Sequence, residues 1–255
     1  MGVDLQKMPQ NIYDNGKFFA EYAALDRSVN GLGSAAEWPR MQSYLPDLKG
    51  LSVIDLGCGF GWFARWARKA GAEFVCGIDI SQNMLDRAQA MTDDPNIRYE
   101  RGDIDSLMLP ECCENRYEVA FSSLTIHYLA HLADFAKHVH RSLKRGGLFV
   151  FSVEHPVYTA PSHPAFIVDK ASGREYWPLD SYHKEGLRLT KWLIEGVEKH
   201  HRTVATYINT FLQAGFELTG FDEWRPTPEE LKTYPYSGHR VLERPVYLVM
   251  AVRKK

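Results

Sequence analysis

Three glycines and two acids carry most of the chemistry that this sequence offers. Gly57, Gly59 and Gly61 alternate directly after an apolar run that contains Asp55, and a second apolar run ends in Asp79. Glycines at the end of a buried strand leave the backbone bare, so a ligand can lie against it and against free N–H groups. An acid at the end of the next strand can accept both hydroxyls of a ribose. The pattern predicts a nucleoside-binding strand–helix–strand unit.

The spacing argues against a dinucleotide-binding dehydrogenase. That fingerprint has glycine at the sixth position of G-x-G-x-x-G, where this chain, counted from Gly57, has the bulky Trp62. Asp55 precedes the first glycine by two residues, and a carboxylate there would repel a pyrophosphate but suits an ammonium group. S-adenosylmethionine carries an ammonium group and a ribose but no phosphate.

Residues 50–154 resemble the class I S-adenosylmethionine-dependent methyltransferases of the small-molecule type. Besides the glycine loop and the acid of the second strand, Gly102-Asp103-Ile104 stands where this family holds the adenine. The turn at 143–147 resembles the family's L-K-P-G-G, with Arg145 in place of proline. The resemblance implies S-adenosylmethionine as methyl donor. The expected cofactor-binding residues are Asp55, Gly57, Cys58, Gly59, Gly61, Asp79, Ile80, Asp103, Ile104, Ser122, Tyr22 and Arg27.

The roles expected for these cofactor-binding residues rest on different arguments. Asp55 is expected on the ammonium side, and Ser122 ends the fourth strand, which in the family lines the methionine side. Arg27 and Tyr22 are candidates for the methionine carboxylate, because a planar guanidinium suits a carboxylate. An ordinary surface arginine and a packed tyrosine remain the alternative for these two.

Two histidines are candidates for a catalytic base. His127 follows the fourth predicted strand and His155 the fifth, at the sheet edge where ligands bind. A histidine with a near-neutral pKa suits general-base chemistry. A structural, hydrogen-bonded histidine is the alternative for each, and many methyltransferases of this fold need no base. His200 and His201 fall in the polar run 199–202 and are expected at the surface.

The elements that must position these residues alternate between strand and helix. Strands are predicted at 51–56, 74–80, 97–101, 117–122 and 148–153, with helices at 62–70, 81–91 and 132–143 between them. A helix at 203–214 and strands at 216–221 and 245–252 close the chain. The expected fold is α/β: a Rossmann-like, doubly wound, seven-stranded, mostly parallel sheet with one antiparallel strand and helices on both faces.

The expected organisation is a single methyltransferase domain in four parts. Residues 1–50 form a helical segment that covers the cofactor, 51–154 the cofactor-binding core, 155–202 an insert that caps the substrate, and 203–255 the closing helix and strands. The insert has little periodicity, and long stretches of this kind in a compact domain are usually functional. Its aromatic residues are candidates for the wall of an acceptor pocket: Tyr158, Phe166, Tyr176, Trp177, Tyr182 and Trp192.

Composition and charge limit the classes of binding partner that we expect. The chain has 255 residues and a net charge of −2, with no long block of one sign, so neither nucleic acid nor an anionic membrane is an expected partner. It has no apolar stretch of 18 residues, hence no expected membrane span. The four cysteines (Cys58, Cys76, Cys112 and Cys113) have no metal-ligand spacing, and we interpret them as reduced thiols of a cytoplasmic protein. No metal is expected, and a homodimer is possible.

The sequence therefore favours transfer of a methyl group from S-adenosylmethionine to a small molecule, on oxygen, nitrogen or carbon. A catalytically silent S-adenosylmethionine-binding regulatory or partner module is the main alternative. An RNA or protein methyltransferase is less favoured, because the fourth strand ends in Ser122-Ser123-Leu124-Thr125 rather than an N-P-P-Y-like tetrad.

Overall fold

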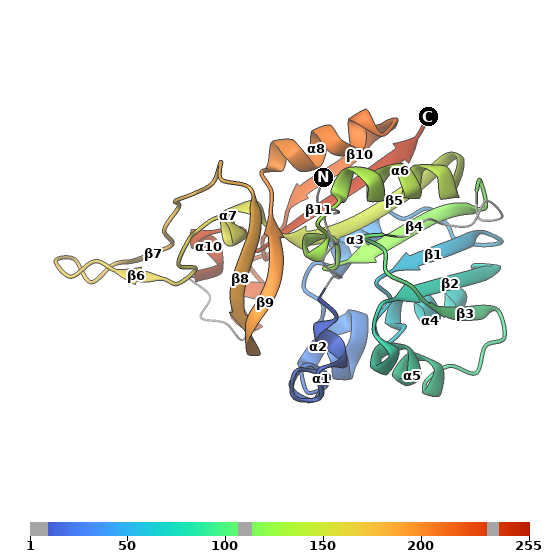
Figure 1. Ribbon diagram of the computed structural model, residues 1–255, viewed down its shortest axis with the longest axis horizontal. Helices are drawn as coiled ribbons and strands as arrows, with labels where there is room; N and C mark the ends of the chain where they lie inside the picture. The colour runs from blue at the N-terminus through green and yellow to red at the C-terminus, as the bar shows by residue number, and fades with distance from the viewer. Residues whose placement is uncertain (1–9, 107–113, 234–239) are drawn as a thin grey trace, which may run out of the picture.

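A seven-stranded sheet forms the centre of the protein (Figure 1), whose computed structural model describes residues 10–106, 114–233 and 240–255. The strand order is β10-β11-β5-β4-β1-β2-β3. Strand β11 runs antiparallel to β10 and β5, and the other neighbours are parallel, which confirms the predicted fold. The strands are β1 (Ser52–Leu56), β2 (Phe74–Asp79), β3 (Ile97–Arg101), β4 (Tyr117–Ser123), β5 (Leu143–Glu154), β10 (Phe216–Glu223) and β11 (Tyr247–Lys254).

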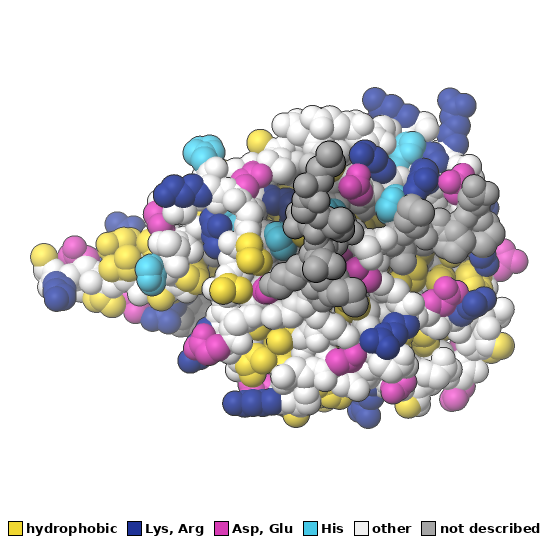
Figure 2. Space-filling model, in the orientation of Figure 1, with side chains coloured by type: hydrophobic (Ala, Val, Ile, Leu, Met, Phe, Trp, Pro, Cys, Tyr) yellow, Lys and Arg dark blue, Asp and Glu magenta, His cyan; other side chains and the backbone are white. Residues whose placement is uncertain are grey.

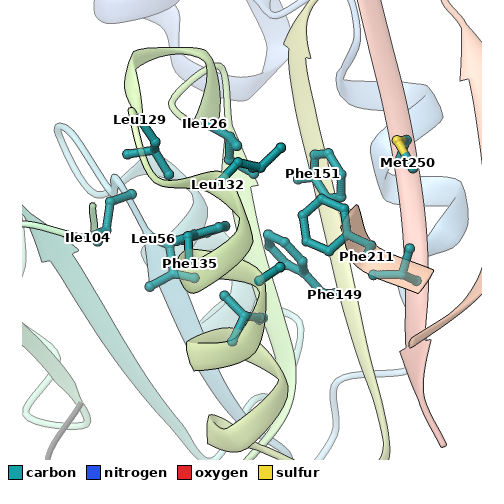
Figure 3. Packing of buried hydrophobic residues seen from close by; sticks show 14 of the residues in the cluster. Leu56, Ile104, Ile126, Leu129, Leu132, Phe135, Phe149, Phe151, Phe211 and Met250 are labelled. Atoms are coloured by element: carbon teal, nitrogen blue, oxygen red, sulfur yellow. The ribbon is translucent and has the colours of Figure 1, made fainter. Parts of the chain in front are cut away.

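Helices cover both faces of the sheet, because its central strands are apolar on both sides. Val53 faces a cluster with side chains of α3 and α4, and its neighbour Ile54 faces the opposite cluster, built with α6 and α8 (Figure 3). The helices are α1 (Gly16–Ala23), α2 (Asp26–Asn30), α3 (Trp38–Tyr44), α4 (Trp62–Lys69), α5 (Gln82–Ala90), α6 (Leu132–Ser142), α7 (Pro156–Thr159), α8 (Val204–Gln213), α9 (Glu230–Thr233) and α10 (Arg240–Glu243), with 3-10 turns η1 (Ile12–Asp14), η2 (Gly31–Ser34) and η4 (Ile126–Tyr128). None of the helices in the described ranges is long and apolar enough to cross a membrane.

Local signals set most boundaries of the core. The side chain of Ser81 accepts a hydrogen bond from the N–H of Met84 and so caps α5, a role that serine commonly fills. Strand β5 is the exception, since it begins at Leu143 rather than at the expected residue 148. The pairing with β4 shifts between Tyr117 and Val119, so the glycine pair at 146–147 forms an irregularity inside a long strand instead of a turn before it.

The insert, expected to be irregular, contains two antiparallel hairpins and the short helix α7. Strands β6 (Ile167–Val168) and β7 (Glu175–Tyr176) project from the body, where Figure 2 shows a group of hydrophobic side chains. Strands β8 (Gly186–Trp192) and β9 (Ile194–His201) pack beside the sheet. Leu187 and Leu189 are 48% and 70% exposed. These leucines alternate with Arg188 and Thr190, so a short strand signal was present, and sequence reasoning missed it.

The polar run 199–202 is not at the surface, and this prediction was wrong for Lys199, His201 and Arg202, all of which are buried. Strand β9 turns alternate side chains inward, and each finds a polar partner there. Lys199 binds Glu154, and the Nδ1 atom of His201 lies 2.8 Å from the Thr159 hydroxyl. The guanidinium of Arg202 donates to backbone carbonyls of the turn before α6. The sequence shows which residues are charged, but it does not show that they are buried beside polar partners.

The N-terminal segment is tied to the β8–β9 hairpin. The side-chain amide of Gln10 donates to the carbonyl of Gly196 (2.9 Å) and accepts from the N–H of Glu198 (3.0 Å). The ring of Trp192, at the end of β8, makes edge-to-face contacts with Phe18 and Tyr22 of α1, at centroid distances of 5.4 and 6.1 Å. The two segments thus form one cover over the carboxyl ends of the central strands.

We predict that Phe211→Ala lowers the free energy of unfolding by about 3–5 kcal/mol, because it empties a filled site in the core. Phe211 is fully buried on α8, and its ring centroid lies 4.7 Å from that of Phe151 (Figure 3). The neighbour Leu212 is 44% exposed, so Leu212→Ala on the same helix should cost far less. Urea unfolding of both variants is the measurement, and equal losses would contradict this packing.

Candidate active site

A deep cavity lies at the carboxyl ends of the central strands, under the N-terminal segment and the β8–β9 hairpin. It encloses about 1040 Å³, including open solvent at its mouth. A smaller cavity of about 540 Å³ adjoins it. The residues that line both are Tyr22, Arg27, Gly57, Gly59 and Ser123. The two cavities therefore form one continuous site that runs past the glycine loop.

The glycine loop approaches this site with bare backbone. Gly57, Gly59 and Gly61 all have left-handed φ angles, of +79°, +51° and +71°. A Cβ atom on Gly61 would lie 2.1 Å from the hydroxyl of Tyr99, so this glycine permits close packing and does not line the cavities. A Cβ atom on Gly59 would meet nothing within 4 Å. Gly59 thus presents open backbone to a ligand.

Asp79 connects the glycine loop to the end of β2. Its two carboxylate oxygens accept one hydrogen bond each, from the N–H of Gly59 (2.8 Å) and of Ser81 (2.9 Å). Burial raises the pKa of Asp79 to about 6, and the two backbone donors oppose that shift. Each oxygen keeps a second lone pair for a ligand hydroxyl.

Asp55 lies at the wall of the smaller cavity, on the far side of the glycine loop. Burial and, after it, the negative charge of Asp79 raise the pKa of Asp55 well above its usual value. Its Oδ2 atom is buried and has no hydrogen-bond partner among the described residues. A buried carboxylate oxygen without a partner is costly, so this position suits a cationic hydrogen-bond donor.

Tyr22 and Arg27 line both cavities, so the structure brings them to the site. One guanidinium nitrogen of Arg27 donates to Glu37 (3.0 Å) and lies 3.4 Å from the hydroxyl of Ser123. Glu37 is fully buried and keeps Arg27 at the junction of the cavities. The alternative of an ordinary surface arginine does not apply to Arg27.

At the other end, Ile80, Asp103 and Ile104 line the larger cavity. Asp103 accepts hydrogen bonds from the N–H of Asp105 (2.9 Å) and the hydroxyl of Ser106 (2.6 Å). These bonds hold the loop after β3 against the cavity, beside the Asp79 end of the site.

Besides Gly61, the predicted cofactor residue Ser122 does not line the cavities, and Cys58 lines only one of them. Ser122 is fully buried and donates to the carbonyl of Leu56 (2.7 Å), so it does not line the cavities. Its neighbour Ser123 lines both, because successive strand residues point to opposite faces. Cys58 is buried and lines only the smaller cavity.

His127 lines the larger cavity, but its protonation does not suit a base. Its Nδ1 atom accepts from the N–H of Glu154 (3.3 Å), so the neutral ring carries its proton on Nε2. Burial and the positive charges of Lys199, Arg202 and Arg27 lower the pKa of His127 well below its usual value. His127 is therefore a neutral hydrogen-bond donor.

His155 is not brought to the cavity. Its Nδ1 atom accepts from the N–H of Val157 (3.0 Å), which caps α7, and its Nε2 atom lies 2.9 Å from Oε1 of Glu223. Burial lowers the pKa of His155, against the opposing effect of Glu223. Both ring nitrogens are engaged in holding the end of β5, which corresponds to the structural alternative for this residue.

Sequence reasoning missed Glu154, which lines the larger cavity and pairs with Lys199. Trp192, one of the aromatic residues expected at the wall of the acceptor pocket, lines this cavity from the insert. Of the insert aromatics, Tyr158, Phe166 and Trp177 instead pack around Arg244. Glu154 stands at the end of a predicted strand, directly before His155, and this position was a usable signal. Among the described residues no three His, Cys, Asp or Glu side chains are arranged to hold a metal ion.

Comparison with known proteins gives a consistent picture. A family model described as a methyltransferase domain matches residues 54–151. The crystal structure of an S-adenosylmethionine-dependent methyltransferase from Mesorhizobium loti is similar, with 46% identity and a TM-score of 0.83, over 88% of this chain and 100% of that one.

Relatives whose names state the molecule that they modify match only part of this chain. A malonyl-[acyl-carrier protein] O-methyltransferase of Pectobacterium atrosepticum is 33% identical over 44% of this chain and 42% of its own length. A tRNA U34 carboxymethyltransferase of Pseudoalteromonas translucida is 31% identical over 45% of this chain and 35% of its own length. This chain thus spans less than half the length of either, and their acceptors differ from each other.

We predict that Gly59→Ala weakens S-adenosylhomocysteine binding at least about tenfold, because its methyl group would occupy the cavity where backbone is now exposed. The left-handed φ alone costs only about 1 kcal/mol of stability. Gly50 also has a left-handed φ (+74°) and open space around its Cβ position, but it lies outside the cavities. Gly50→Ala is therefore the matched control. Calorimetric titration of both variants tests this, and equal affinities would remove Gly59 from the binding site.

Proposed function

The chain belongs to the family of S-adenosylmethionine-dependent methyltransferases, and we propose that it methylates a small molecule, on oxygen, nitrogen or carbon. S-adenosylmethionine is the methyl donor. Family membership favours an enzyme over a silent binding module. The observation that supports a small acceptor is the cover over the cavity, since Trp192 and the N-terminal residues Gln10 and Tyr13 line it from outside the sheet. A covered cavity of about 1040 Å³ suits a small molecule beside the donor.

The residues of the site fit the donor. When bound, S-adenosylmethionine supplies a methyl group activated by a sulfonium. The partnerless Oδ2 atom of Asp55 would accept from its ammonium group, and binding of that cation would favour the ionised carboxylate. Arg27 and Tyr22 would hold the methionine carboxylate, Asp79 the ribose, and the loop of Asp103 the adenine.

The remaining contribution of the protein is alignment and exclusion of water. Methyl transfer is an in-line displacement, so holding two reactants in line can supply about 7–11 kcal/mol in favourable cases. Tyr128, Leu129 and Trp192 give the cavity an apolar wall beyond the glycine loop. His127 would donate a hydrogen bond from Nε2 and orient the acceptor, rather than remove a proton.

Incubation of the purified protein with methyl-deuterated S-adenosylmethionine and a heat-treated cell extract that contains metabolites, carrier proteins and RNA tests the proposal. The mixture is divided by ultrafiltration and each fraction is read by mass spectrometry. We expect a labelled product in the filtrate, and less of it with Gly59→Ala at the same concentration of donor. Label found only in the retained carrier proteins or RNA would contradict a small acceptor.

We predict that affinity for S-adenosylhomocysteine rises as the pH increases through about 6, the pKa of Asp79 in the free protein. Below that pH the carboxyl group is protonated; above it the carboxylate accepts the ribose hydroxyls more strongly. A hydrogen bond to a charged group is worth about 1 kcal/mol more than one to a neutral group, or roughly fivefold in affinity. Asp79→Asn should remove the rise near pH 6 from the profile measured by calorimetry between pH 5 and 8, while any dependence that Asp55 contributes stays. A flat profile in the unaltered protein would remove Asp79 from ribose binding.

A further inference from the structure

A buried ion pair lies at the end of the cavity away from Asp79. Lys199 of β9 donates to Oε1 of Glu154, at the end of β5, over 2.6 Å, and the two side chains are 4% and 15% exposed. The ammonium group lies 4.9 Å from the ring centroid of Trp192 and 6.0 Å from that of Tyr128. Because desolvation of two charges offsets their attraction, stability alone is a weak reason for such a pair.

Only one of the two oxygens of Glu154 is satisfied. Oε2 is buried, and within the part of the chain that the structure describes it has no hydrogen-bond partner. Lys199 anchors Oε1, which fixes the orientation of the carboxylate. The result is a hydrogen-bond acceptor that is held in place beside the cavity and not used by the protein.

The strand order separates this acceptor from the donor site. Between β2, which carries Asp79, and β5, which carries Glu154, lie β1 and β4. Three strand spacings amount to roughly 14 Å. Glu154 therefore lies at the opposite end of the cavity from the proposed ribose contact.

The other polar groups near this end differ from Glu154. Asp105 is occupied, since it accepts from the N–H groups of Ala130 (3.0 Å) and His131 (2.7 Å) and pairs with the His131 ring. His127 is neutral and carries its proton on Nε2, so it can only donate. Among the described residues at this end of the cavity, Glu154 is thus the anionic group with an oxygen that accepts no hydrogen bond.

We propose that Glu154 Oε2 accepts a hydrogen bond from the nucleophile of the methyl acceptor, which is therefore a hydroxyl or amino group on an aromatic or apolar small molecule. Trp192 and Tyr128 supply the apolar wall, and Lys199 holds the carboxylate in place. This inference rests on the proposed function and restricts it, because a carbon nucleophile offers no such donor. Glu154 acts here as a specificity-determining residue.

Two probes of the same shape test the proposal on the full-length protein loaded with S-adenosylhomocysteine. Phenol offers an O–H donor, and anisole carries a methyl group in its place. We expect phenol to bind at least about tenfold more tightly than anisole in ligand-detected NMR titrations, because it reaches a charged acceptor. Equal binding of the two, or binding of neither, would overturn the proposal.

The Glu154→Gln variant tests whether Glu154 causes the preference for phenol over anisole. The amide oxygen will face Lys199, which places the NH₂ group where Oε2 was and replaces an acceptor by a donor. The preference for phenol should then disappear. Glu195→Gln is the matched control, since Glu195 forms an exposed pair with Lys191 on the same hairpin; it should keep the preference. A preference that survives Glu154→Gln would exclude Glu154 as the contact.

Loading the protein with S-adenosylhomocysteine distinguishes a failure of the Glu154 inference from a failure of the proposed function. Failure of the unaltered protein to bind S-adenosylhomocysteine would count against the proposed function. Binding of S-adenosylhomocysteine without a phenol preference would count against Glu154 alone.

Discussion

The carboxylate of Asp79 is the interaction on which the site depends. It joins the N–H of Gly59, in the loop after β1, to the N–H of Ser81, at the start of α5. These bonds hold the glycine loop, with its left-handed φ angles, at the edge where β1 and β2 end. The raised pKa of Asp79 reflects the cost of keeping this charge buried. A ligand with hydroxyl groups would offset part of that cost by adding donors.

The position of the site at one edge of the sheet explains why the protein needs a cover over the cavity. The carboxyl ends of β1, β2, β4 and β5 meet at one edge of the sheet, and the cavity there is bounded on the sheet side by the last residues of these strands and by the loops that follow them. The N-terminal segment and the β8–β9 hairpin close it, joined by the amide of Gln10 and the aromatic contacts of Trp192. Exclusion of water then strengthens every polar contact inside.

Charged side chains are buried at three points along the site. Asp55 and Glu154 each keep one buried oxygen without a partner among the described residues, and Arg27 is held at the junction of the cavities by the buried Glu37. A core built for stability alone would avoid such groups. Along the site, Asp103 and Asp79 lie at the end proposed for the adenine and the ribose, and Glu154 and His127 lie at the end proposed for the methyl acceptor. Asp55 and Arg27, proposed for the ammonium and carboxylate groups of the donor, line the smaller cavity beside the glycine loop.

The sequence by itself determined the sheet, the glycine loop and the positions of Asp55 and Asp79, because those signals are local: apolar runs, turn glycines and an acid at a strand end. It did not reveal the pairing of Lys199 with Glu154 or of Gln10 with β9, which join residues 45 and 186 or more positions apart. Residue type was misleading for Lys199, His201 and Arg202, since a charged run is buried only when the tertiary structure supplies partners. The hydrogen bonds of His127 and His155 were likewise decided by the tertiary structure, because the partner at Nδ1, and not the residue's place in the chain, determines which nitrogen carries the proton.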